Sequence, residues 1–151
     1  MDSNNSSIKG VVGAILFSLI AIFCWSIFSF VGELGFWSAP AFGLLIPLGF
    51  RIFSKKYPHS VGYIAATTII ITLAIIAAAY IGYVMNIYAL FLWQGMAFSE
   101  ITLISVNDYL RMMVLSDTHF VYDCIYEMGV GLIAALIFEV IYIAVTKKKK
   151  V

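Results

Sequence analysis

Charged residues are scarce in this chain. They make up only 11% of its 151 residues, while 63% are hydrophobic. A soluble globular domain carries roughly 25% charged and about 45–50% apolar residues. The chain therefore lacks the polar surface that such a domain needs, and its mean hydropathy is +1.02. This composition excludes an ordinary soluble domain and predicts an integral membrane protein.

Cysteine and histidine are also rare, with two of each. Cys24 and Cys124 fall in apolar stretches without a CxxC pair, so neither a zinc site nor a disulfide scaffold is indicated. We expect two buried thiols, with a Cys24–Cys124 disulfide as the less favoured alternative. His119 lies near Asp117 and Asp123, but a metal site would need more converging ligands, so a solvated loop is favoured. We expect no metal and no cofactor.

Motifs of catalysis are missing as well. The chain has no HExxH, no G-x-S-x-G and no phosphate-binding glycine loop. The sequence therefore favours a protein that is not an enzyme. Nothing beyond a short lysine tail suggests nucleic-acid binding, and we expect none.

Long apolar stretches are what the sequence does contain. About 20 apolar residues cross a hydrocarbon core of roughly 30 Å. We predict an all-α, polytopic membrane protein of one domain, with four transmembrane helices over residues 9–31, 37–53, 61–90 and 120–146. Residues 1–7 are expected to form a disordered tail, and residues 147–151 a basic cytoplasmic tail.

Two of these helices leave alternatives open. The apolar run after Lys9 is longer than the roughly 7–15 residues of a signal-peptide core, which favours an uncleaved helix over a secretory signal. Pro47 lies inside the short second helix and removes a backbone hydrogen bond, which predicts a kink. A re-entrant hairpin is the alternative for that segment.

Residues 94–119 form the largest segment between predicted spans. Within it, Ser105-Val-Asn-Asp108 matches the S-x-x-[DE] start of a helix, which we predict over residues 105–116. Apolar positions then recur at helical spacing, at Val106, Tyr109, Leu110, Met113 and Val114. The pattern predicts an amphipathic, extracytoplasmic helix that either lies in the membrane interface or caps the bundle.

Basic residues are strongly biased in their placement. With four spans, eight of the nine lie on one side, namely Lys9, Arg51, Lys55, Lys56 and the run Lys147–Lys150, while Arg111 lies on the other. Cytoplasmic loops carry an excess of Lys and Arg. The expected location is therefore the cell membrane, with both termini cytoplasmic.

Four features together resemble a group of small, uncharacterised integral membrane proteins from Firmicutes. They are a short loop after the first span, a basic turn after the second, the segment Glu100-Ile-Thr102 before the amphipathic helix, and a Gly-x-Gly-Leu at Gly129–Leu132. The resemblance covers roughly residues 10–146. Some members of the group carry a zinc ribbon ahead of the membrane part, and this chain has none. The resemblance implies the architecture and no specific function.

The last predicted span carries carboxylates, which are expensive inside a membrane. Asp123 and Glu127 are spaced i,i+4 and share a helix face. Glu127 lies roughly 10 Å below the outer end of this span, where Tyr83 and Asn86, with the nearby Tyr80, are its expected partners. One interpretation is a proton- or cation-binding group in a polar pocket. The other, which is favoured, is a protonated or hydrogen-bonded glutamic acid that fixes helix packing.

Glu139 lies deeper in the same span, about 120° around the helix from Glu127. We predict that it forms a structural ion pair in the inner half of the membrane, with Arg51 or a lysine as its partner. The tail residues Lys147, Lys148, Lys149 and Lys150 are expected to anchor the topology and to contact lipid headgroups.

Two hypotheses for function follow. The favoured one is a membrane-embedded interaction or accessory subunit, whose partners are the lipid bilayer and either a homo-oligomer or another membrane protein. The alternative is a small oligomeric transporter or channel subunit that binds a proton or cation at Glu127 and Asp123. The surroundings of Glu127 distinguish them. A water-filled cavity would favour transport, packing against Tyr83 and Asn86 without water would favour a structural role, and a lipid-facing Glu127 at an exposed stripe of small residues would favour a partner helix.

Overall fold

The protein is built of α-helices, as predicted. The computed structural model describes residues 2–32, 35–55 and 61–148, and those ranges contain five α-helices and one short 3-10 helix. They are α1 (Asp2–Gly32), η1 (Gly35–Ser38), α2 (Ala39–Ser54), α3 (Val61–Trp93), α4 (Leu103–Ser116) and α5 (Thr118–Lys148).

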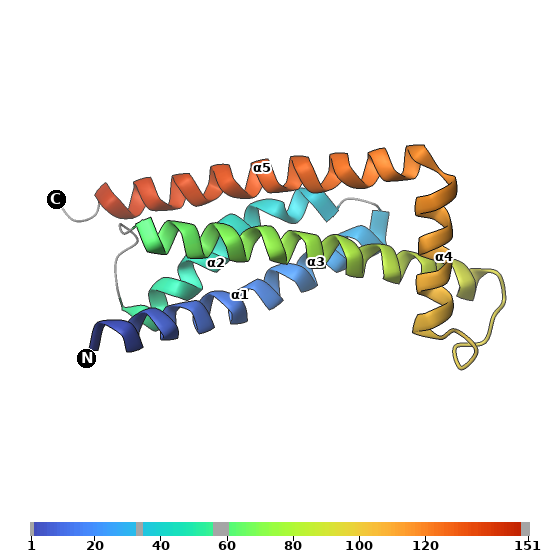
Figure 1. Cartoon of the computed structure of the whole chain (residues 1–151), viewed down its shortest axis with the longest axis horizontal. Coiled ribbons are helices and arrows are strands. Elements are labelled where there is room, and N and C mark those ends of the chain that lie inside the picture. The colour runs from blue at the N-terminus through green and yellow to red at the C-terminus, as the bar shows by residue number, and fades with distance from the viewer. Residues whose placement is uncertain (1, 33–34, 56–60, 149–151) are drawn as a thin grey trace.

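Four of the helices run along the long axis of the molecule in alternating directions (Figure 1). The beginning of α1 and the end of α5 lie at the same end, and α4 crosses the bundle at the opposite end, close to the end of α3. The predicted order of helices is confirmed.

Three helices have the length and apolar composition of membrane spans within the described ranges: α1 over Ser6–Ser29, α3 over Val61–Trp93 and α5 over Thr118–Thr146. The 33 residues of α3 extend about 50 Å, well beyond a hydrocarbon core of roughly 30 Å. The apolar helix α2 is shorter, with 16 residues over about 24 Å.

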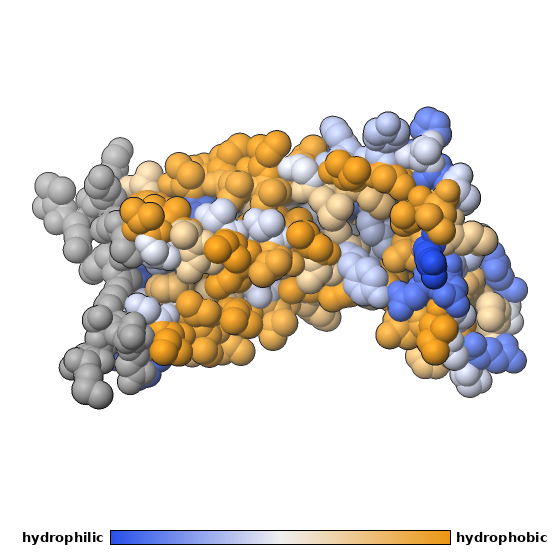
Figure 2. Space-filling view, in the orientation of Figure 1, coloured by the Kyte–Doolittle hydropathy of each residue, from blue (hydrophilic) through white to orange (hydrophobic). Residues whose placement is uncertain are grey.

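The outward face of the long helices is apolar (Figure 2). Large apolar side chains point away from the bundle, among them Leu19 and Phe23 on α1, Leu73 on α3, and Ile133 and Val140 on α5. On the face shown in Figure 2, hydrophilic residues gather at the end where α4 crosses. This distribution suits a bundle with lipid around its middle.

Glycines bring α2 unusually close to its neighbours. A Cβ on Gly49 would lie 2.5 Å from the carbonyl oxygen of Gly13 in α1, and a Cβ on Gly13 would lie 2.4 Å from the carbonyl of Gly49. On the other side of α2, a Cβ on Gly43 would lie 2.0 Å from the carbonyl of Ala135 in α5. Only hydrogen fits at these three positions, so α2 packs backbone to backbone between α1 and α5.

The ends of several predicted elements need correction. Residues 2–7 were expected to be disordered, but α1 begins at Asp2. Extending an existing helix costs far less than starting one, and the Ser6 hydroxyl donates a 2.6 Å hydrogen bond to the carbonyl of Ser54. The second predicted helix divides into η1 and α2, with Pro40 in the first turn of α2, where proline is tolerated.

The start of α4 also differs from the prediction. Its N-cap is Thr102, which forms a capping box with Ser105, so the helix begins at Leu103 and the predicted Ser105–Asp108 box is wrong. The serine hydroxyl at the third helical position fulfils the role that the S-x-x-[DE] pattern assigns to a carboxylate.

The apolar face of α4 packs against the bundle as predicted. Val106 is fully buried in a cluster with Ile87 of α3 and Ile101, and Tyr109 and Leu110 pack against that cluster. Val114 is the exception, since it is exposed. Of the two placements left open, α4 therefore caps the end of the bundle.

A sharp corner joins α4 to α5. The backbone N–H of Asp117 donates to the carbonyl of Met113 and closes α4. The Asp117 side chain then accepts hydrogen bonds from the backbone N–H groups of His119 and Phe120, in the first turn of α5. One aspartate thus ends one helix and caps the next, which fixes the direction in which α5 enters the bundle.

Candidate functional site

A pocket of about 520 Å³ lies beneath α4, at the end of the bundle away from the termini. Its walls come from α1, α3, α4 and α5, so four segments far apart in the sequence build it. Four non-aromatic lining residues have polar or ionisable side chains, namely Ser29, Asn86, Asp123 and Glu127, and Met113 adds a sulfur atom. Five are aromatic: Trp25, Tyr83, Tyr109, Phe120 and Tyr126.

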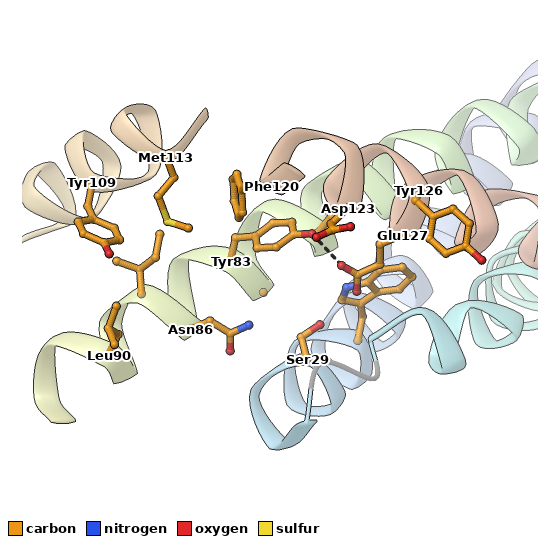
Figure 3. A pocket seen from close by; sticks show the side chains of 14 residues that line it. Ser29, Tyr83, Asn86, Leu90, Tyr109, Met113, Phe120, Asp123, Tyr126 and Glu127 are labelled. Atoms are coloured by element: carbon orange, nitrogen blue, oxygen red, sulfur yellow. Dashed lines mark hydrogen bonds between the residues drawn. The ribbon is translucent and has the colours of Figure 1, made fainter. Parts of the chain in front are cut away.

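Glu127 is held at the pocket wall by α3. The Tyr83 hydroxyl donates a 2.8 Å hydrogen bond to Oε2 of Glu127, and Figure 3 shows the two side chains reaching toward each other. The Tyr83 ring is itself fixed by an edge-on contact with Phe120, with ring centroids 5.3 Å apart. Glu127 is half-buried, so the hydrogen-bonded carboxyl still borders the cavity.

Trp25 forms the inner part of the pocket wall and is completely buried. Its ring packs edge-on against Phe42 of α2, and it passes so close to Gly131 of α5 that a Cβ there would lie 2.8 Å from the indole. Its pyrrole edge faces Gly82 of α3, where an added Cβ would lie 3.8 Å from Cδ1. The two glycines leave the room that the large indole needs between α3 and α5.

The indole nitrogen of Trp25 finds no hydrogen-bond partner in the described part of the chain. An indole N–H is a donor only, and leaving one buried without an acceptor costs about 1–3 kcal/mol. Ser29 and Asn86 line the same cavity (Figure 3).

The prediction of partners for Glu127 is thus confirmed only in part. Tyr83 is its donor, as expected, and Asn86 and Asp123 share the pocket with it. Tyr80 is not a partner, because its hydroxyl donates a 2.7 Å hydrogen bond to Asn107 and ties α3 to α4 instead. Asp123 is exposed at the rim.

The pocket is electrostatically one-sided. Two of its lining residues are carboxylic acids, one turn apart on α5, and no lysine, arginine or histidine is among the lining residues that the structure describes. Opposite charges within a few ångströms favour each other strongly where water is sparse. The arrangement therefore suits a positively charged guest.

Glu139 occupies a separate buried site, about half a bilayer thickness away from Glu127 along α5. It accepts hydrogen bonds from the Thr67 hydroxyl and, at 3.1 Å, from the Thr68 hydroxyl, both on α3. Both Glu127 and Glu139 therefore point toward α3, since each accepts a hydrogen bond from that helix. The angle of about 120° that separates the two side chains around α5 still keeps both on the side of α5 that packs against the bundle. The ion pair with Arg51 stays a prediction.

Sequence reasoning missed the part of the site that α1 contributes. Trp25 and Ser29 lie in an apolar helix with no charge to mark them, and only the crossing with α3 and α5 shows their role. One sign was present in the Gly-x-Gly of α5, because Gly131 makes room for Trp25 while Gly129 has open space around it.

Other predicted residues form no second site in the described ranges. Cys24 and Cys124 are free and half-buried thiols, and no group of three or more His, Cys, Asp or Glu side chains converges in the part of the chain that was described. The side chains of Lys147 and Lys148, and all of Lys149 and Lys150, lie outside the described residues, as does His59.

No protein-family model, no curated protein and no solved structure matches this chain. The resemblance to small Firmicutes membrane proteins stays a prediction.

Proposed function

We propose that the protein crosses the membrane four times, with α2 as the fourth span and both termini in the cytoplasm. In support, α2 runs along the bundle with α1, α3 and α5 (Figure 1). It packs closely against α5 at Gly43 and against α1 at Gly49. The length of α2, about 24 Å, together with η1 before it comes close to the thickness of a hydrocarbon core, at about 30 Å. The lysine-rich end of the bundle then faces the cytoplasm.

We further propose that the protein is a small transporter subunit that binds a cation from the outer side of the membrane. The observation that supports this most is the pocket, which places Asp123 and Glu127 beside a cavity with no basic group in its described lining. An ionisable group within a span is costly and is usually retained for a function. The pocket occupies only the end of the bundle beneath α4, so a complete pathway across the membrane requires an oligomer or a groove between helices.

Labelling of single cysteines tests the topology. In a background of Cys24→Ser and Cys124→Ser, a cysteine at Ser99 should react with an impermeant maleimide in intact cells. A cysteine at Lys55 should react only after lysis. Ser99 and Lys55 are both exposed and lie at opposite ends of the bundle, so accessibility of the thiol does not bias the comparison. A cysteine at Trp37, which is exposed just before α2, should label from the same side as Ser99, and labelling of Trp37 and Lys55 from one side would refute α2 as a span.

Flux in proteoliposomes tests the function. Purified protein should carry protons or cations, and Glu127→Gln should abolish the flux because it removes the charge while keeping the shape. Asp108→Asn is the matched control, since Asp108 is an exposed acid on α4 that does not line the pocket. Equal flux from wild type and Glu127→Gln, or no flux from well-folded protein across several ions and both pH gradients, would refute the proposal.

A second candidate is a membrane-embedded accessory subunit. The hydrogen bond between Tyr83 and Glu127 favours it, because that contact also suffices to fix α3 against α5. In this case Glu127→Gln would lower stability without changing flux, and crosslinking from the outer face of α5 would capture a membrane partner. Residues Ile133 and Val140, which are exposed on that face, are suitable positions for a photo-crosslinker.

A further inference from the structure

We propose that the pocket takes an organic cation, with an apolar body and one hydrogen-bond acceptor, as its ligand. The inference rests on the proposed cation-binding function and adds the chemical class of the ligand. It follows from four properties of the cavity, namely its charge, its aromatic walls, its volume and an unpaired donor in its wall.

The charge of the lining selects for a positive group. Asp123 and Glu127 project from adjacent turns of α5, and Glu127 is fixed by the 2.8 Å hydrogen bond from Tyr83. Figure 3 shows this hydrogen bond between the Tyr83 hydroxyl and the Glu127 carboxyl. No basic residue is among the described lining residues to neutralise them. A cation placed here is attracted by both carboxyl groups.

The aromatic content of the wall selects for a large, weakly hydrated cation. Five of the fourteen lining residues are aromatic, and Tyr83 and Phe120 are locked edge to face with centroids 5.3 Å apart. Aromatic faces attract cations within about 6 Å, and groups of them are the usual binding sites of quaternary ammonium ions. A small metal ion gains little from such a wall because it holds its water tightly.

The number of strong metal ligands and the volume of the cavity also argue against a dehydrated metal ion. Oxygen-binding cations such as Ca²⁺ take about 6–8 oxygen ligands, and no group of three or more His, Cys, Asp or Glu side chains converges in the residues described. The cavity of about 520 Å³ is far larger than an ion needs. It falls within the roughly 300–1,000 Å³ of pockets that bind small organic molecules.

The unpaired nitrogen of Trp25 adds a requirement for an acceptor. The indole is completely buried, lines the cavity and finds no acceptor in the described chain. A ligand with an ester, carbonyl or hydroxyl oxygen near its cationic group would satisfy this donor while the carboxylates hold the charge. Ser29 and Asn86 also line the cavity.

A soluble cation fits better than a phospholipid headgroup. Ethanolamine and choline headgroups present the same ammonium, but they carry a phosphate next to it. The described lining offers that phosphate no lysine or arginine and holds two carboxylates that would repel it.

Benzoylcholine is a suitable probe, because it combines a quaternary ammonium, an ester and a ring. Its neutral carbon isostere, 3,3-dimethylbutyl benzoate, has the same shape without the charge. Trp37→Phe and Trp93→Phe leave Trp25 as the only tryptophan of the chain, and both replaced residues are highly exposed and do not line the pocket. Binding is then read as a saturable change in Trp25 fluorescence of the full chain in detergent.

We expect saturable binding of benzoylcholine and none of the neutral isostere above its partition into detergent. Glu127→Gln should weaken binding about tenfold or more, and Asp108→Asn should leave it unchanged. Asp123→Asn is the second variant, since Asp123 is exposed and we expect the fold to tolerate its substitution. It should weaken binding even if Glu127→Gln does not fold.

The outcomes separate this inference from the proposed function. Flux of inorganic cations that depends on Glu127, without benzoylcholine binding, would overturn the ligand class and leave cation binding in place. Neither flux nor binding would overturn both. Equal binding of the charged and neutral probes would overturn the role of charge. Loss of benzoylcholine binding in phosphatidylcholine nanodiscs, compared with phosphatidylglycerol nanodiscs, would overturn the assignment to a soluble cation and point to the headgroup.

Discussion

The hydroxyl of Tyr83 and the carboxyl of Glu127 join α3 to α5 through a 2.8 Å hydrogen bond at the wall of the pocket. The two residues are 44 positions apart, and the crossing of two long helices brings them together. This contact orients the acid that the proposed function requires. It also connects the stability of the bundle to the shape of the cavity.

Tyr83→Phe should lower the free energy of unfolding by about 1 kcal/mol, because it removes the hydroxyl that Glu127 accepts from while the ring keeps its contact with Phe120. Thermal unfolding in detergent measures the effect. Tyr88→Phe is the control, because its hydroxyl bonds to the exposed carbonyl of Phe98 and its loss should change stability by less than about 0.5 kcal/mol. Equal stability of Tyr83→Phe and wild type would contradict the prediction.

Gly131→Ala should displace the indole of Trp25, because the new Cβ would lie 2.8 Å from the ring. In the protein with Trp25 as its only tryptophan, we expect a shift of the emission maximum and a loss of about 1–3 kcal/mol from overpacking. Gly129 lies two residues away, and a Cβ there would meet nothing within 4 Å. Gly129→Ala should therefore neither shift the emission maximum nor lower the stability. Identical spectra for the two variants would show that the close packing is absent.

Gly43→Ala should be more damaging than a surface substitution, because its Cβ would lie 2.0 Å from a backbone carbonyl of α5. Neither backbone can move aside without separating α2 from α5, so we expect a loss of about 1–3 kcal/mol or more. Gly62→Ala is the matched control, since Gly62 has open space around it in the first turn of α3. A Gly43→Ala variant with an unchanged melting temperature would argue against this packing of α2.

Thr67 and Glu139 should be energetically coupled, because the buried glutamate accepts a hydrogen bond from the threonine hydroxyl. Thr67→Val or Glu139→Leu alone leaves a buried polar group with fewer partners, at a cost of about 1–3 kcal/mol each. The double variant should cost less than the sum of the two. Additive effects in a double-mutant cycle, measured by unfolding in detergent, would exclude the coupling.

Asp117→Ala should destabilise the corner between α4 and α5 by about 1 kcal/mol, since the side chain caps the N–H groups of His119 and Phe120. Hydrogen exchange at the start of α5 should report the loss locally. Asp108→Ala removes a similar charge at the same end of the molecule without removing a cap, and it should leave exchange in α5 unaltered. Equal exchange in the two variants would refute a capping role.

Much of the fold was predictable because membrane spans depend on local composition. The apolar stretches indicated α1, α3 and α5, since a chain in lipid has to satisfy its backbone hydrogen bonds within each helix. The amphipathic spacing of Val106, Tyr109 and Leu110 likewise indicated the face on which α4 packs. Exact helix ends were less predictable, because several residues compete to cap one turn, as Thr102 does at the start of α4.

The candidate site was only half predictable. Asp123 and Glu127 stood out in the sequence because carboxylates are costly inside a span, and helical spacing placed them on one face. Nothing local marked Trp25, since an indole in an apolar helix is ordinary. Its role depends on Gly82 and Gly131, which belong to two other helices.

By itself the sequence determined which segments are apolar helices, where its charges lie along them and which acids lie deep within them. These properties follow from each segment's own composition and periodicity. Only the tertiary structure decided that Tyr83 bonds Glu127, that Thr67 bonds Glu139 and that four helices enclose a cavity. Those relationships depend on which helices cross and how closely, and no single segment encodes such contacts between helices.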